Sequence, residues 1–171
     1  MRTPILAAFV LLLCLAPATH VPAAADDAVF VNKDFGFQVD RPQGWTFSEP
    51  KPPETSSYAM KLAKVKNNTE TSLTVYVVPR NEKINNSKEA SDAAETNWKQ
   101  NDKLSNISRG KGKLAGQEAN WLKGAYDAGT RYTIRQHFLV NDDFIYILQS
   151  LAPEKEFNTA RTIQSQSARA Y

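Results

Sequence analysis

The fold is decided by residues 131–151, which read RYTIRQHFLVNDDFIYILQSL. Apolar and polar side chains alternate over 131–140, which predicts a strand. Asn141-Asp142-Asp143 has turn chemistry, so a second strand over 144–151 should return antiparallel beside the first. In this second strand both alternating sets of side chains are apolar, and it therefore needs cover on both faces of its sheet.

Two segments have the helical spacing that such cover requires. Apolar residues recur at this spacing in residues 87–103, namely Ala90, Ala93, Ala94 and Trp98. Asn86, followed three residues later by Glu89, is typical of a capping box at the start of that helix. Pro153 favours the start of a second, C-terminal helix containing Phe157, Ala160 and Ile163. The fold class that we predict is α+β, a mostly antiparallel sheet with helices on both faces.

The other strands follow from the same alternation. In the first half we expect a β meander with strands at 35–39, 58–62 and 73–77, the last two joined by a hairpin turn at 67–69. In the second half we expect strands at 106–113 and 118–126. Trp45 follows the turn residues Pro42-Gln43-Gly44, and we expect its ring to be buried at the start of a strand.

Residues 1–25 have the three parts of a cleavable secretory signal. Arg2 gives a positive start, residues 5–15 form an apolar run, and residues 23–25 are alanines, so we expect cleavage after Ala25. A retained membrane anchor would need about 20 apolar residues, and Pro17 interrupts this run. The sequence therefore predicts a protein exported to the periplasm or secreted, with no transmembrane segment after cleavage.

Residues 26–171 are predicted to form a single domain. This segment has 146 residues, which is enough to bury a core. Cys14, the only cysteine, lies within the signal, and Leu13 before it is not the small residue that lipoprotein processing requires. The domain holds 20 basic and 18 acidic residues, a balance too even to indicate a nucleic-acid-binding protein.

Residues 30–45, FVNKDFGFQVDRPQGW, resemble the opening of domains in the PsbP-like and Mog1-like superfamily. The similarity continues in residues 113–116, KLAG, and in the late strand FIYILQS at 144–150. The resemblance implies an αβα sandwich built on an antiparallel sheet. It also implies binding in place of catalysis, because the superfamily includes extrinsic photosystem subunits, a nuclear transport factor and exported bacterial proteins. The predicted signal argues against a nuclear role.

The sequence carries no recognisable catalytic or metal site. It has no Gly-x-Ser-x-Gly elbow, and its domain lacks a thiol and holds a single imidazole, that of His137. Alternation along its strand predicts that His137 faces solvent, and one histidine does not make a transition-metal site. We therefore expect no cofactor and no metal. Asp142 and Asp143 belong to a turn in which aspartate is favoured for backbone reasons.

Charge is uneven along the domain. Between Lys99 and Arg135 there are eight basic and three acidic residues. Two strands place basic residues at alternate positions, and these are the candidate binding residues: Arg109, Lys111 and Lys113 on one strand, with Arg131 and Arg135 on another. If both strands expose these sets on one face, five cations converge on an anionic partner. The structural alternative is that lysines protect a sheet edge from aggregation.

Two functions fit these observations. The first is a non-enzymatic exported binding or accessory module that docks onto an envelope or membrane-associated complex or an anionic ligand. The second is a small extracytoplasmic hydrolase that acts on cell-wall or glycan material through carboxylates. A deep cleft with two facing acids would favour the hydrolase, and a shallow basic or flat surface would favour the binding module.

Overall fold

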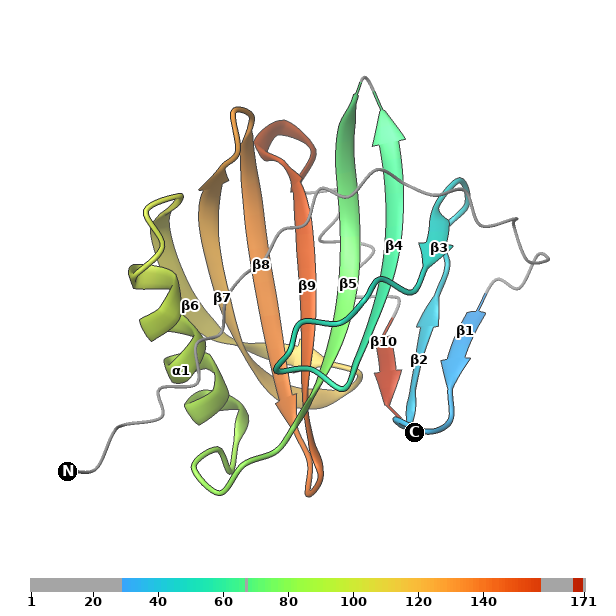
Figure 1. The fold of residues 1–171 in the computed structure, drawn as a ribbon, viewed down its shortest axis with the longest axis vertical. Helices are drawn as coiled ribbons and strands as arrows, with labels where there is room; N and C mark the ends of the chain where they lie inside the picture. The colour runs from blue at the N-terminus through green and yellow to red at the C-terminus, as the bar shows by residue number, and fades with distance from the viewer. Residues whose placement is uncertain (1–28, 67, 158–167, 171) are drawn as a thin grey trace.

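The computed structural model describes residues 29–66, 68–157 and 168–170. Within these ranges the chain forms two antiparallel sheets and one α-helix (Figure 1). The elements are β1 (Val29–Asn32), β2 (Phe37–Asp40), β3 (Thr46–Ser48), β4 (Tyr58–Lys66), β5 (Thr69–Pro79), α1 (Ser87–Lys99), β6 (Leu104–Leu114), β7 (Gln117–Asp127), β8 (Arg131–Val140), β9 (Phe144–Pro153), the 3-10 turn η1 (Glu154–Glu156) and β10 (Ala168–Ala170).

The larger sheet has seven strands in the order β3-β4-β5-β9-β8-β7-β6, and every neighbouring pair is antiparallel. The two predicted hairpins are confirmed, since β4 pairs with β5 and β8 pairs with β9. At the second turn the backbone N–H of Asn141 donates to the carbonyl of Phe144, and the Asn141 side chain accepts from the N–H of Asp143. Turn chemistry at 141–143 therefore sets the register of the central strands.

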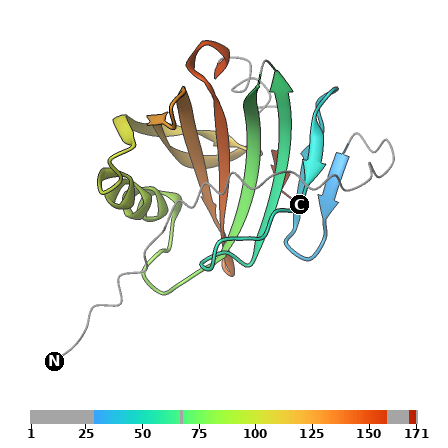
Figure 2. The ribbon, with the colours of Figure 1, turned by 45° about the horizontal axis from the view of Figure 1, so that its top comes forward.

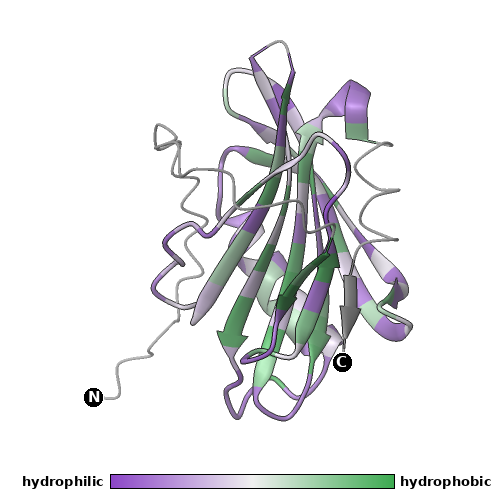
Figure 3. Ribbon diagram, turned by 90° about the vertical axis from the view of Figure 1, so that its right-hand side faces the viewer, coloured by the Kyte–Doolittle hydropathy of each residue, from purple (hydrophilic) through white to green (hydrophobic). Residues whose placement is uncertain are grey.

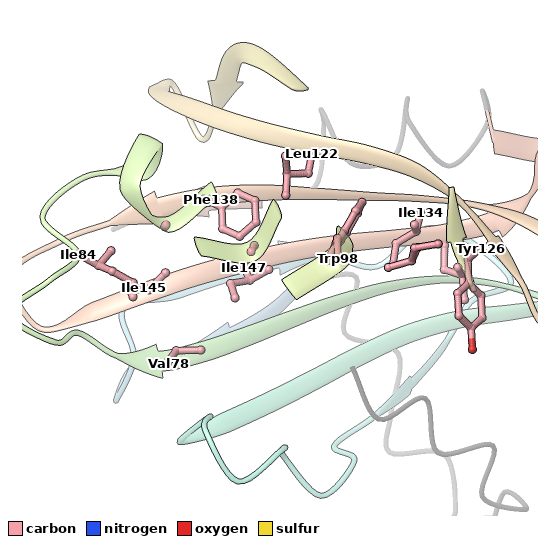
Figure 4. Packing of buried hydrophobic residues seen from close by; sticks show 13 residues of the cluster. Val78, Ile84, Trp98, Leu122, Tyr126, Ile134, Phe138, Ile145 and Ile147 are labelled. Atoms are coloured by element: carbon pink, nitrogen blue, oxygen red, sulfur yellow. The ribbon is translucent and has the colours of Figure 1, made fainter. Parts of the chain in front are cut away.

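Helix α1 covers one face of the large sheet and packs on β6, β7 and β8 (Figures 1 and 2). Its start is capped as predicted, because the Asn86 side chain accepts a hydrogen bond from the N–H of Glu89. Trp98 enters the core that this helix shares with the sheet, together with Leu122, Ile134 and Phe138 (Figure 4). The Trp98 ring lies so close to β7 that a Cβ on Gly124 would stand 3.3 Å from it.

The opposite face is covered by a second sheet, in the order β1-β2-β10 (Figure 2). The prediction of helices on both faces is thus replaced, for the described residues, by one helix on one face and a small sheet on the other. Strand β2 belongs to this small sheet, so it is not part of the first-half meander. After Pro153 the chain makes the short turn η1, and the rest of the predicted C-terminal helix lies outside the described residues.

The small sheet closes a second apolar core. Phe37 and Val39 of β2 pack against Val75 and Leu148 of the large sheet, and the predicted burial of Trp45 is confirmed, since only 8% of this residue is exposed. Figure 3, seen from the side of this small sheet, shows hydrophobic residues gathered in the strands and hydrophilic ones in the connecting loops. Both faces of β9 are therefore buried, as its sequence requires.

The prediction that His137 faces solvent is wrong, because the residue is only 7% exposed. Alternation assigned His137 to the polar side of β8, but both sides of this central strand are covered. Burial, together with the nearby Arg135 guanidinium, lowers the pKa of His137 to about 4, so the imidazole is neutral at physiological pH.

Candidate functional site

A cavity of about 160 Å³ lies between the two sheets. Its apolar walls come from both layers: Phe37 and Val39 of β2, Val75 of β5, Leu114 of β6, Leu139 of β8 and Leu148 of β9. These residues all belong to the core that the small sheet closes. The cavity therefore exists because the three-stranded sheet does not fill the whole space over the larger one.

The β6–β7 turn forms part of the cavity lining, through Leu114, Ala115 and Gln117. Ala115 has φ 53° and Gly116 has φ 79°, so both central residues of the turn are left-handed. Such a two-residue turn matches the twist of its flanking strands, but its first position normally takes asparagine, aspartate or glycine. Ala115 thus holds a methyl group in a backbone conformation that disfavours a side chain.

Polar groups of the lining are uncharged amides and one phenol. They belong to Gln117, Asn141 and Tyr146, whereas the side chain of Gln38 lies on the outer face of β2, opposite to Phe37 and Val39. The Tyr146 hydroxyl donates to the carbonyl of Phe35 at 2.9 Å and accepts from the Asn141 amide at 3.1 Å. Burial raises the pKa of Tyr146 above its usual value, so the phenol stays protonated. Among the lining residues that the structure describes there is no carboxylate, imidazole or ammonium group.

The sheet register separates the candidate basic residues into two groups. Directly opposed residues on neighbouring strands share a face. Arg109 lies opposite Leu122, and Leu122 lies opposite Gln136, so Arg109 shares its face with the even-numbered residues of β8. Arg131 and Arg135 lie on the other face of the sheet. The five cations therefore do not converge, although each remains a candidate for binding on its own face.

Three of the five cations have protein partners. Arg109 reaches from β6 to helix α1 and binds Asp92 at 2.9 Å and Glu95 at 3.0 Å. Arg131 pairs with Glu154, and the Arg135 guanidinium stacks on Trp121 at 4.4 Å from the ring centroid. These contacts within the domain give Arg109, Arg131 and Arg135 a structural role.

Lys111 and Lys113 are different, because both are exposed and neither forms an ion pair within the described part of the chain. They lie on β6, the outermost strand of the large sheet. The Trp121 ring crosses this strand beside Gly110, where an added Cβ would come within 2.4 Å, and the indole N–H donates to the carbonyl of Lys111. Trp121 and the lysines together fit a protected edge that also presents positive charge.

Helix α1 carries two acids, Asp92 and Glu95, that both bind Arg109 of β6. A hydrogen bond from Lys88 lowers the pKa of Asp92, and a hydrogen bond from Lys99 lowers the pKa of Glu95, with Arg109 adding to both effects. Both carboxylates are therefore ionised partners in an ion-pair network. Among the described residues there is also no group of three histidine, cysteine or acidic side chains that could hold a metal ion.

The fold is PsbP-like and Mog1-like, which confirms the resemblance drawn from the sequence. The chain is similar to the solution structure of the cyanobacterial PsbP protein CyanoP of Synechocystis (TM-score 0.58, 12% identity, covering 89% of this chain and 98% of that one). It is also similar to LpqN of Mycobacterium tuberculosis, described as involved in cell envelope biogenesis (TM-score 0.55, 15% identity, covering 78% and 82%). A protein of Bacteroides thetaiotaomicron is similar over 84% of this chain and 48% of its own length (TM-score 0.52, 14% identity).

Residues 30–171 match the family described as the serine/threonine kinase C-terminal domain, and the chain belongs to this family. The description names a domain of a kinase, so membership assigns no reaction to the chain. No curated protein matches the sequence. No helix in the described ranges is long and apolar enough to cross a membrane.

Sequence reasoning missed the cavity. Its walls are ordinary core residues, and their alternation does not distinguish a filled space from an empty one. One signal was present in the turn Leu114-Ala115-Gly116-Gln117, where alanine occupies a position that favours asparagine or glycine. The basic residues were found from the sequence, but their faces depend on the register of three strands.

Proposed function

We propose that this chain is a non-enzymatic, exported binding module that docks onto an envelope or membrane-associated complex or an anionic ligand. The observation that carries the proposal is the cavity between the sheets, whose described lining is apolar with a few uncharged polar groups. Such a lining can hold an uncharged group, and its described residues include no carboxylate, imidazole or thiol.

The comparisons support an accessory role at the cell envelope. LpqN, which has the same fold, is described as involved in cell envelope biogenesis. The family of this chain is named as a C-terminal domain of kinases, which is consistent with a module that serves another protein. Export through residues 1–25 would bring the domain to that compartment.

The second candidate, a hydrolase acting through carboxylates, has less support. An acid catalyst for glycoside cleavage needs a carboxyl group whose pKa is raised, so that it stays protonated. Asp92 and Glu95 have lowered pKa values instead and are held by three basic partners. Within the described part of the chain, no carboxylate lines the cavity.

Lys111 and Lys113 are the positively charged residues that we expect to attract an anionic ligand or partner. Surface charges attract a partner of opposite charge, and salt screens this attraction over about 8 Å at physiological ionic strength. We expect a Lys111→Glu/Lys113→Glu variant to capture less partner from native envelope fractions at low salt. Lys51→Glu/Lys83→Glu is the matched control, because it changes the net charge equally at exposed lysines elsewhere.

The two variants must share the melting temperature of the unmodified protein for the comparison to hold. The proposal is supported if only the β6 variant loses capture, and if capture by the unmodified protein weakens with salt while the residual capture by the β6 variant does not. Equal capture by all three proteins at both salt levels would leave the lysines as edge protection. Turnover of cell-wall or glycan substrates by the purified protein would replace the proposal with the hydrolase.

A further inference from the structure

We propose that the cavity between the two sheets is a binding site for one large, uncharged apolar side chain of a polypeptide, with the flanking peptide groups held at the amides of its lining. The inference deepens the proposed function, on which it rests, by naming the ligand class of the cavity.

Size limits the ligand to a single group. Pockets that hold whole drug-sized molecules occupy about 300–1,000 Å³. An apolar cavity of about 150 Å³ in another protein holds one benzene molecule. At about 160 Å³, this cavity accommodates a phenylalanine, leucine or isoleucine side chain, and a larger ligand would leave most of its bulk outside.

The walls select an apolar group without charge. Side chains of six buried apolar residues converge on the space from β2, β5, β6, β8 and β9: Phe37, Val39, Val75, Leu114, Leu139 and Leu148. A charged ligand would lose its hydration there without gaining a countercharge from the described lining residues, because none of these is charged. The cavity is thus chemically distinct from the lysines of β6.

The polar groups favour a peptide over a simple hydrocarbon. Amide side chains donate and accept at once, which matches the N–H and C=O groups on either side of an inserted side chain. Asn141 is already engaged, because its amide bonds Tyr146 and the backbone of its own turn. Gln117 lies opposite Leu114 on the face of the sheet that lines the cavity, and it makes no side-chain hydrogen bond within the described residues, so it can bond a ligand.

The β6–β7 turn gives an independent indication. Ala115 lines the cavity at φ 53°, where glycine or asparagine would be more stable. Left-handed backbone at residues other than glycine is uncommon and clusters at functional sites. The methyl group of Ala115 adds apolar surface to the lining, and the proposal gives this methyl group a role.

NMR titration of the intact protein tests the proposal. The measured signals are the methyl resonances of four residues of the cavity wall, Val39, Val75, Leu139 and Leu148. N-acetyl-phenylalaninamide and N-acetyl-leucinamide are expected to shift these resonances saturably. Toluene should bind more weakly, because it lacks peptide groups, and N-acetyl-phenylalanine should bind more weakly because of its carboxylate. N-acetyl-glycinamide, which has no side chain, should not bind.

Two kinds of variant check the site. Val75→Phe fills the cavity and should weaken binding of the amides by at least about tenfold. If this variant does not fold, Ala115→Gly serves, because it relaxes the turn, should raise the melting temperature and should still weaken binding. Gln117→Ala should weaken binding of the amides while leaving the binding of toluene unchanged.

The proposal is overturned if no probe shifts these methyl groups saturably, or if the filled variant binds as well as the unmodified protein. It is also overturned if toluene binds as tightly as the amides, since the site would then select a free apolar molecule. Binding of the probes without capture of an envelope partner would count against the proposed function alone. Capture without probe binding would count against this inference alone.

Discussion

His137 shows how the environment of one residue changes its chemistry. Its position in an alternating strand predicts exposure, yet cover on both faces of β8 leaves it 7% exposed with a pKa of about 4. The unfolded chain takes up a proton near pH 6.5, whereas the folded chain resists it. The stabilisation from keeping the imidazole neutral is therefore full above about pH 6.5 and is lost as the pH falls towards 4.

This difference predicts the pH dependence of stability. A shift from 6.5 to about 4 corresponds to about 3 kcal/mol of unfolding free energy lost between neutral pH and pH 4. His137→Gln, which has no proton to gain, should lose less stability over that interval. Urea denaturation of both proteins at pH 7 and pH 4 measures the difference, and identical losses would show that the imidazole is protonated in the fold.

Trp45 is the second residue for which burial predicts a measurable effect. Its ring lies in the core between the two sheets, so Trp45→Ala should lower the free energy of unfolding by about 3–5 kcal/mol. Trp45→Phe, the matched control, should retain much of that packing. Thermal melts compare the three proteins, and an unchanged melting temperature for Trp45→Ala would contradict the position of this ring.

At the scale of the elements, the sequence predicted the positions of strands and of helix α1 better than it predicted which elements cover the large sheet. The strand and helix positions agree closely with the alternation and with the capping residues, because both depend on neighbours along the chain. The C-terminal helix predicted on the second face of the large sheet is not seen there, since Pro153 precedes only the short turn η1 within the described residues. Strand β2 covers that face instead, and its sequence gives no indication of which sheet it joins.

The start of helix α1 provides a test at this scale. The Asn86 side chain accepts from the N–H of Glu89 at 3.0 Å, while the Glu89 carboxylate accepts from the N–H of Asn85 at 2.6 Å. Removing the first contact with Asn86→Ala should cost about 1 kcal/mol of stability, and Asn86→Ser should cost little. Chemical denaturation distinguishes the two variants, and equal stability of the alanine variant would mean that solvent caps the helix as well.

The faces of β6 and β8 explain why the five candidate basic residues do not lie on one face of the sheet. Alternation places Arg109, Lys111 and Lys113 on one face of their strand, and this much needs no structure. Whether Arg131 and Arg135 join them depends on the pairing of β6, β7 and β8, which the sequence of each strand alone does not determine. The register sets them on opposite faces.

At the scale of the molecule, export remains a prediction because residues 1–28 lie outside the described structure. The three-part N-terminus predicts that the mature chain begins at or near Asp26. Mass spectrometry of the protein from the extracytoplasmic fraction of its native cells reads this end directly. A mature pool that retains Met1 would contradict the prediction.

The central claim is that this two-sheet domain binds a partner through the cavity between its layers. Photo-crosslinking tests it most directly, with a crosslinkable residue at Gln117, beside the cavity, and a control at Ala128, at the other end of β7. In native envelope fractions we expect an adduct from position 117 that disappears when Val75→Phe fills the cavity. An adduct from position 117 that persists in the filled variant, or equal adducts from both positions, would contradict the account.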